Sequence, residues 1–272
     1  SSGEARGTLY AIDTRIGVQP TLYAGTSHAC ARNADGLLCW GRNDFGQAAF
    51  ASPDDPVRPV NVDLAAYVLA LGERHSCAIA AGSGDVLCWG ANGSGELGDG
   101  TELDRRTPAP VVGITSATQL AATTSLNGAA NGATCAIVGG GEVWCWGYNQ
   151  EGQLGNPTSS HSTVPLRVQG LARADWIAAG AKSFCARDGS DTYCWGQNVN
   201  GELGLGTTSS FETRATRAPM LDRFSSLSLG HGFGCGTDGG RVYCWGDNRI
   251  GQINGSAGRP ERALTPLEVT LE

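Results

Sequence analysis

Short apolar runs alternate with turn-forming residues along the chain, and the arrangement recurs about every 50 residues. The clearest marker of the recurrence is a Cys-Trp-Gly triplet, whose tryptophans are 49, 57, 49 and 50 residues apart. A period of this length indicates one supersecondary unit that is repeated and shares its core with its neighbours. The five triplets are Cys39-Trp40-Gly41, Cys88-Trp89-Gly90, Cys145-Trp146-Gly147, Cys194-Trp195-Gly196 and Cys244-Trp245-Gly246.

Each unit contains several predicted strands in a constant order. A strand that ends in Gly comes first, as in Leu69-Ala70-Leu71-Gly72, and a hairpin leading into the triplet follows, as in Val86-Leu87-Cys88-Trp89. After the triplet come an Asn-x-x-Gly turn, a Thr/Ser-rich loop and a Pro-led strand such as Val164-Pro165-Leu166-Arg167-Val168. Many short strands with turns at a fixed period predict an all-β radial repeat.

The ten cysteines form five pairs within the units. Members of a pair are 9 to 11 residues apart, and the residues between them are turn formers such as Gly139-Gly140-Gly141. The two cysteines of each pair therefore lie opposite each other across a hairpin, where their Cβ atoms are close enough for a disulfide. The predicted disulfides are Cys30–Cys39, Cys77–Cys88, Cys135–Cys145, Cys185–Cys194 and Cys235–Cys244.

Two alternatives for the cysteines are weaker. Ten reduced thiols packed as small apolar groups are one. Zinc binding is the other: His28 and His75 precede the first Cys of their units by two residues, but Ala133, Ser183 and Phe233 occupy the matching positions elsewhere. A zinc site needs a complete ligand set, so we expect no metal and no cofactor.

The repeated pattern resembles the regulator of chromosome condensation repeat. The resemblance runs from about residue 21 to residue 272 and includes Gly95-Glu96-Leu97-Gly98, Gly152-Gln153-Leu154-Gly155 and Gly201-Glu202-Leu203-Gly204. It implies a β-propeller of four-stranded antiparallel blades, with one hairpin disulfide in each. The disulfides make the chain similar to a secreted, bacterial-type member, since nuclear and cytosolic members would not keep them.

The number of blades departs from the family pattern, because only five units are present and family propellers usually have seven. We expect residues 21–272 to form one ring of five blades and residues 1–20 to form a peripheral N-terminal segment. The strand near 265–271 would then complete the blade that begins at Thr21. A fragment of a larger ring and a domain-swapped assembly are the alternatives.

The composition of the chain excludes several classes of binding partner and of function. The net charge is −7 and the pI is about 5.1, which argues against binding nucleic acid through its phosphates. No apolar run approaches the roughly 18 residues of a membrane span. The four histidines follow no common pattern and there is no Gly-x-Ser-x-Gly elbow, so we expect no catalytic residues and no enzyme activity.

Candidate binding residues lie where the units differ. The variable positions of the Asn-x-x-Gly turns line one annular face and include Phe45 and Arg249, with Tyr148 just before its turn. Trp176 occupies a position that is small or aliphatic in other units, where it is either local packing or an aromatic anchor. Asn127 lies in the loop of residues 123–132, which lengthens the third unit and is either a binding loop or a neutral insertion.

These features predict a secreted, periplasmic or cell-surface scaffold that acts as a monomer and binds a protein through its annular loops. A carbohydrate-binding propeller is the alternative. It would need similar aromatic residues in equivalent loops of all five units, whereas Phe45 and Tyr148 occur once each at different offsets.

Overall fold

The computed structural model describes residues 21–33, 36–52, 58–124, 131–253 and 260–269, and the fold over these residues is all-β. Twenty strands form five antiparallel sheets of four strands each, with one disulfide in every sheet. The expected fold class, five four-stranded blades that each carry a hairpin disulfide, is therefore confirmed. Each sheet is one blade, and its strands follow one another in chain order.

The blades have these bounds. Blade 1 contains β1 (Thr21–Ala24), β2 (His28–Asn33), β3 (Gly36–Gly41) and β4 (Val60–Val62). Blade 2 contains β5 (Ala66–Leu71), β6 (His75–Ala80), β7 (Val86–Gly90) and β8 (Arg105–Pro110). Blade 3 contains β9 (Gln119–Ala122), β10 (Ala133–Ile137), β11 (Val143–Gly147) and β12 (Ser162–Arg167). Blade 4 contains β13 (Trp176–Ala179), β14 (Ser183–Asp188), β15 (Asp191–Gln197) and β16 (Phe211–Arg217). Blade 5 contains β17 (Ser226–Leu229), β18 (Phe233–Asp238), β19 (Arg241–Asp247) and β20 (Arg262–Glu268). Two 3₁₀ turns, η1 (Gly139–Gly141) and η2 (Pro219–Leu221), complete the described elements.

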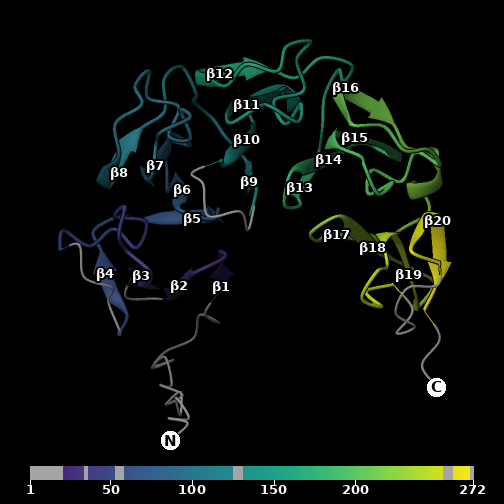
Figure 1. Ribbon diagram of the computed structural model, residues 1–272. Coiled ribbons are helices and arrows are strands. Elements are labelled where there is room, and N and C mark those ends of the chain that lie inside the picture. The colour runs from purple at the N-terminus through teal and green to yellow at the C-terminus, as the bar shows by residue number, and fades with distance from the viewer. Residues whose placement is uncertain (1–20, 34–35, 53–57, 125–130, 254–259, 270–272) are drawn as a thin grey trace, which may run out of the picture.

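The blades are arranged as an arc around a common axis. Their first strands lie innermost and their fourth strands outermost (Figure 1). Consecutive blades are in contact, and the innermost strands β1, β5, β9, β13 and β17 touch in that order. Figure 1 shows the arc open between blade 1 and blade 5. We refer to the two surfaces that border this opening as the end faces of the arc.

The expected ring closure by the C-terminal strand is wrong. β20 pairs with β19 in blade 5, and blade 1 has its own fourth strand, β4. Every Pro-led strand is the fourth strand of the unit in which it occurs, so the described residues leave no strand to be shared between the ends. The peripheral segment predicted for residues 1–20 lies outside the described residues, as does the part of the predicted closing strand after Val269.

The Cys-Trp pair serves two junctions at once because adjacent residues of a strand point to opposite faces of the sheet. The cysteines face the next blade, and the tryptophans face the preceding one. The core at the junction of blades 2 and 3 shows this, since it contains Cys88 of blade 2 and Trp146 of blade 3. The other junctions combine Cys39 with Trp89, Cys145 with Trp195, and Cys194 with Trp245.

Each internal tryptophan also donates a hydrogen bond across its junction. Its side chain is fully buried, and the register of the sheet is irregular beside it. The indole nitrogen donates to the backbone carbonyl of the Gln or Glu that follows the Asn-x-x-Gly turn of the preceding blade. The pairs are Trp89 to Gln47 at 3.0 Å, Trp146 to Glu96 at 2.9 Å, Trp195 to Gln153 at 2.8 Å and Trp245 to Glu202 at 2.9 Å.

The disulfides join directly facing residues of each hairpin, with Cα atoms 4.1 Å apart. The eight cysteines of blades 1 to 4 have no exposed surface, because the next blade covers them. Cys235 of blade 5 is only half-buried, because blade 5 borders the opening. The bridges are therefore part of the junction cores as well as staples of the hairpins.

Replacing Trp146 by Phe should lower the free energy of unfolding by about 1–3 kcal/mol, because the Glu96 carbonyl loses its donor inside the core. The matched change Trp40→Phe should cost less than about 0.5 kcal/mol, because Trp40 is half-buried and donates to none of the described residues. Urea denaturation of both variants measures the difference. Equal losses would contradict the role assigned to the junction hydrogen bond.

Replacing Cys135 and Cys145 together by Ala should lower the free energy of unfolding by about 2.5–3 kcal/mol from the released loop alone, since only ten residues separate the cysteines. The buried cavity should add to this loss. The same replacement of Cys235 and Cys244 should show a smaller cavity contribution. Denaturation without reductant measures both, and intact mass before and after reduction checks the pairing.

Candidate binding face

The five Asn-x-x-Gly turns lie at one end of the blades, and we call this surface the turn face. Each turn is held by a fully buried Asn whose side-chain oxygen accepts the backbone N–H five residues later. The Gly that follows has φ between 75° and 90°, a conformation that disfavours other residues. The Asn bonds are Asn43 to Ala48 at 3.1 Å, Asn92 to Leu97 at 2.9 Å, Asn149 to Leu154 at 2.8 Å, Asn198 to Leu203 at 3.3 Å and Asn248 to Ile253 at 3.0 Å.

The same Asn side chains fasten the loop that follows each turn. The amide nitrogen of Asn92, for example, donates to the backbone carbonyls of Thr101 at 3.0 Å and Leu103 at 3.1 Å. The frame of the turn face is therefore rigid, while the residues between Asn and Gly differ from blade to blade. The fixed Asn of every unit was the sequence signal for this frame, although its loop partners were not predictable from the repeat alone.

Phe45, one of the predicted binding residues, lies on the turn face at the junction of blades 1 and 2. It is half-buried, and the guanidinium carbon of Arg74 lies 5.0 Å from its ring centre. Arg74 precedes β6, so a residue of blade 2 covers the turn of blade 1. At the junction of blades 3 and 4, Lys182 forms a 2.7 Å ion pair with Glu151 in the same way. Cations of one blade thus contact the turn of the blade before.

Tyr148 is less available than the sequence predicts. Its side chain is buried, and its hydroxyl donates to the Gln150 side-chain oxygen at 2.8 Å. Burial, with a further contribution from Glu151, raises the pKa of the Tyr148 hydroxyl. Tyr148 thus contacts the turn of blade 3 through its hydroxyl group.

Arg249 is exposed on the turn of blade 5 and is held by a bidentate interaction with Asp247. Its Nε and Nη2 atoms lie 2.9 and 2.8 Å from the two carboxylate oxygens. The Arg249 hydrogen bond holds the pKa of Asp247 below its usual value. The planar pairing fixes the direction of the guanidinium, which makes Arg249 an oriented positive group on the turn face.

Trp176 lies on the opposite side of the molecule. It begins β13 and pairs with Arg187 beside the β14–β15 hairpin, whereas the turns follow the other end of the third strands. The Arg187 guanidinium carbon is 5.3 Å from its ring centre, and Trp176 packs against the core between blades 4 and 5. The structure therefore does not group Trp176 with Phe45, Tyr148 and Arg249, and it supports local packing for this residue.

The longer loop of blade 3 starts and ends on the turn face. Asn127 lies outside the described residues. Thr124, at the start of the loop, accepts a hydrogen bond of 3.3 Å on its carbonyl from the Thr26 hydroxyl of blade 1. At its other end, a Cβ atom added to Gly132 would lie 2.5 Å from the His75 ring of blade 2. The described parts of this loop thus approach the two preceding blades.

Two histidines link the second strands of neighbouring blades. His28 lies 2.8 Å from the Ser76 hydroxyl, and His75 lies 2.8 Å from the Thr134 hydroxyl. Burial lowers the pKa of His28 to about 4 and that of His75 to about 3, so both are neutral at physiological pH. Within the described ranges there is no group of three or more His, Cys, Asp or Glu residues placed to hold a metal ion.

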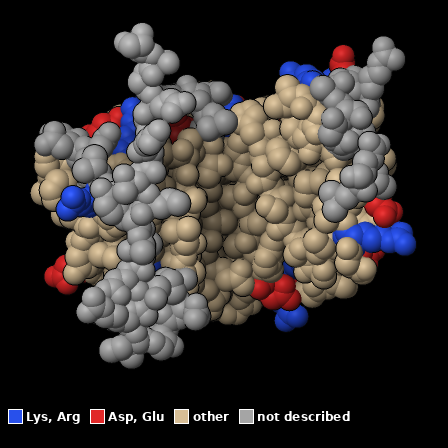
Figure 2. All heavy atoms as spheres, turned by 90° about the horizontal axis from the view of Figure 1, so that it is seen from below, with Lys and Arg blue, Asp and Glu red and all other residues tan. Residues whose placement is uncertain are grey.

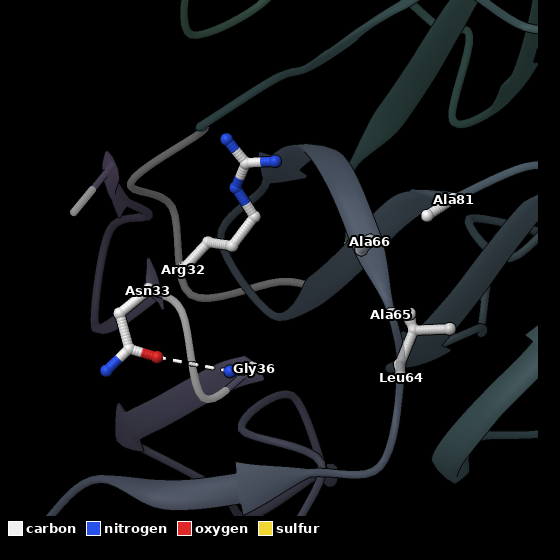
Figure 3. A pocket seen from close by; sticks show the side chains of 7 residues that line it. All are labelled: Arg32, Asn33, Gly36, Leu64, Ala65, Ala66 and Ala81. Carbon is white, nitrogen blue, oxygen red and sulfur yellow. Dashed lines mark hydrogen bonds between the residues drawn. The ribbon is translucent and has the colours of Figure 1, made fainter. Parts of the chain in front are cut away.

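The hairpin face, opposite the turn face, has a hollow at the junction of blades 1 and 2 (Figure 3). Among the described residues that line it, Arg32 is the one that carries a charge, and the hydrogen bond drawn there joins the Gly36 N–H to the Asn33 side chain at 3.1 Å. The other lining residues are Leu64, Ala65, Ala66 and Ala81. Among these described residues there is no acid–base pair with which to perform catalysis.

Glu96 is a buried carboxyl group at a position where three other blades have Gln. One carboxylate oxygen accepts the Ser94 N–H at 2.8 Å, as Gln47, Gln153 and Gln252 do in their turns. The other oxygen is buried and has no partner among the described residues. Burial raises the pKa of Glu96 to about 8, so the group is largely protonated at neutral pH and takes the place of a neutral amide.

The fold and the turn face define a β-propeller scaffold stapled by disulfides. Two profiles of the regulator of chromosome condensation (RCC1) repeat match the chain, one over residues 83–127 and 140–186 and the other over residues 21–47 and 69–96. The matched stretches thus have the sequence of RCC1 repeats, and the chain folds as an RCC1-type β-propeller. None of the described helices is long and apolar enough to cross a membrane.

Similarity to individual proteins covers only part of their length. The ultraviolet-B receptor UVR8 of Arabidopsis thaliana is 30% identical over 174 residues, which make up 60% of this chain and 38% of UVR8. Human WBSCR16 superposes with a TM-score of 0.75 at 20% identity, over 92% of this chain and 66% of that one. Yeast RCC1 (Prp20) gives a TM-score of 0.75 at 19% identity, over 92% and 61%. The chain therefore spans less than two thirds of each of these proteins.

Stability should fall as the pH rises from about 4.5 to about 8, because the folded state raises the pKa of Glu96 above its unfolded value. The stabilising contribution of the protonated group is complete below the unfolded pKa and is lost as the pH rises through the folded pKa. Glu96→Gln should reduce the loss in the free energy of unfolding over this pH range by on the order of 2–5 kcal/mol.

Urea midpoints between pH 4 and pH 9 measure this profile. The reverse change Gln153→Glu is the matched control, since it places a second carboxyl in the same buried frame and should steepen the pH dependence. If Glu96→Gln left the slope unchanged, Glu96 would be ionised in the folded protein at neutral pH.

Proposed function

We propose that this protein is a binding scaffold whose turn face recognises a protein partner. The observation that carries the proposal is the contrast within this face. Buried Asn side chains and left-handed glycines hold all five turns in one geometry, while the residues between them differ in charge, size and polarity. A rigid frame with varied side chains lowers the entropy lost on binding a large surface.

The turn face offers the kinds of group that protein interfaces use. An aromatic ring covered by an arginine, an oriented arginine and an exposed aliphatic side chain lie on one surface. They are Phe45 with Arg74, Arg249, and Val199. No aromatic residue recurs at equivalent turn positions, which favours one extended partner over the same small sugar bound once by every blade.

Related proteins support a protein partner. Yeast RCC1 (Prp20) has been crystallised with Kap60 bound, and the structure of Prp20p was reported with its binding properties to Gsp1p and histones.

The five disulfides fit an oxidising environment, so we place the protein outside the cytosol, secreted or at the cell surface. Their burial in the junction cores protects four of the five from reductants.

Val199→Asp should weaken capture of the partner, because it places a charge on the turn face where a partner would exclude water. Val242→Asp is the matched control. The two side chains are 43% and 42% exposed, but Val242 lies at the hairpin end of β19. Arg249→Ala should also weaken capture through the loss of an oriented charge. The measurement is cross-linking of the immobilised chain to surface proteins of its source organism, followed by mass spectrometry.

The proposal fails if Val242→Asp abolishes the specific cross-links while Val199→Asp and Arg249→Ala retain them. It also fails if glycan screening shows several equivalents of one sugar bound per chain. Thermal denaturation of each variant confirms that a loss of capture does not come from unfolding.

A further inference from the structure

Three linkers between blades have the same geometry, which allows their junctions to be aligned residue by residue. Each linker leads from the fourth strand of one blade into the first strand of the next. The residue just before that first strand donates a backbone hydrogen bond of 2.8 Å to the second strand of the same blade. The donors and acceptors are Thr118 and Ile137, Asp175 and Arg187, and Ser225 and Thr237.

Two of the three aligned junctions carry an arginine–aspartate pair on the hairpin face. The arginine lies two residues before the donor, and the aspartate directly follows the acceptor. The pairs are Arg173–Asp188 at 3.0 Å and Arg223–Asp238 at 4.0 Å. Between blades 2 and 3, Ser116 and Val138 occupy the same two places. Figure 2 shows acidic and basic side chains together at the margins of the molecule, so a junction without such a pair is an exception.

An aromatic ring directly precedes the second hairpin cysteine in the same three blades. In blade 4, the guanidinium carbon of Arg217 lies 5.7 Å from the ring centre of Tyr193. In blade 5, that of Arg223 lies 4.2 Å from the ring centre of Tyr243. The ring of blade 3 is Trp144, which is half-buried against the core between blades 2 and 3. Among the described residues, no cationic group lies over this indole.

These exchanges leave a hollow on the hairpin face between blades 2 and 3. It has a cavity volume of about 290 Å³, and its lining includes Trp144, the carboxylate of Glu142 and the hydroxyl groups of Thr115 and Ser116. This volume is at the lower limit for small-molecule pockets and suits a single side chain. A Cβ atom added to Gly113 at the rim would meet no atom within 4 Å, so a peptide backbone can approach the hollow there.

Glu142 is the charged group among the described residues that line this hollow. One of its carboxylate oxygens accepts the Trp144 indole N–H at 3.3 Å, and the other forms a 3.2 Å ion pair with Arg167. Arg167 is not a lining residue, so it holds the carboxylate without occupying the hollow. Each carboxylate oxygen has two lone pairs and can accept a further N–H group. The hollow thus combines an indole with a fixed negative charge.

We propose that this hollow binds the guanidinium group of an arginine side chain from a peptide segment of another protein. The guanidinium would stack on Trp144 and bond to Glu142, as Arg217 does with Tyr193 and Asp191 in blade 4. Trp is the best aromatic partner for a cation, and a planar guanidinium stacks and donates at once, which an ammonium group does not. The hollow lies opposite the turn face, so this inference does not rest on the proposed function.

Titration of the isotope-labelled full chain with the capped peptide Gly-Gly-Arg-Gly-Gly tests the proposal. The readout is the chemical shift of the Trp144 indole N–H, which is assigned by its absence from the spectrum of Trp144→Leu. The peptide should shift this resonance with a dissociation constant in the millimolar range. The Lys analogue should bind more weakly. The analogue with citrulline, the neutral isostere of arginine, should leave the resonance in place.

Trp144→Leu should weaken peptide binding by about 2- to 30-fold, followed on the backbone amide of Ser116, because it removes the cation–π contact. The variant places at this position the residue that blades 1 and 2 have there, Leu38 and Leu87. Glu142→Gln should weaken binding severalfold. It keeps the shape of the hollow and removes the charge, so it tests the site even where Trp144→Leu lowers stability.

Tyr193→Leu is the matched control, because it removes the ring at the same place in blade 4, where Arg217 already covers it. It should leave peptide binding unchanged. Val199→Asp and Arg249→Ala alter the turn face, and they should leave this titration unchanged as well. Failure of the arginine site and failure of the proposed turn-face recognition are therefore observed separately.

Three outcomes would overturn the proposal. In the first, the arginine peptide leaves the Trp144 indole resonance unshifted at millimolar concentrations. In the second, the citrulline peptide shifts it as much as the arginine peptide does. In the third, Tyr193→Leu weakens binding as much as Trp144→Leu. A shift caused by a neutral disaccharide, without one caused by the peptide, would instead assign the hollow to sugar stacking.

Discussion

The contact between consecutive blades is the interaction on which the rest of the structure depends. A single blade has two apolar sheet faces, and neither is buried by the blade itself. The Cys-Trp dipeptide places one side chain on each face, so the disulfide of one blade and the indole of the next pack into a common core. The indole hydrogen bond to a buried carbonyl then sets the position of the incoming blade. Stability thus comes from junctions, which is the usual situation in repeat proteins.

Junction packing also explains how the turn face is presented. The carbonyl that receives the indole follows the Asn-x-x-Gly turn, so the contact that joins two blades also anchors the base of the turn. Residues such as Arg74 and Lys182 then reach back from the next blade to the turn they follow. The turn side chains of blades 1 to 4 are therefore positioned by their own blade and by the next one. In blade 5, the described residues that position the turn belong to that blade alone.

Buried polar groups show how the repeat tolerates variation. Gln and Glu alternate at the position that accepts the turn N–H, and Glu is accommodated because burial favours its neutral form. The turn N–H therefore keeps an acceptor in all five blades. On the second strands, by contrast, His28 and His75 bond to hydroxyl groups of the next blade, whereas Ala133, Ser183 and Phe233 occupy the matching positions of the other blades.

The sequence by itself determined the strands, the hairpins and the disulfide pairs, because these features join residues about ten positions apart and every repeat contains them. It also determined that Phe45 and Arg249 lie in equivalent turns. Only the tertiary structure decided that Trp176 lies on the opposite face, that Tyr148 is buried, and that β20 remains in blade 5. It alone decided that the five described blades form an open arc. The angle between blades arises from packing of side chains about 50 residues apart. One repeat therefore contains no information on how many neighbours complete a ring.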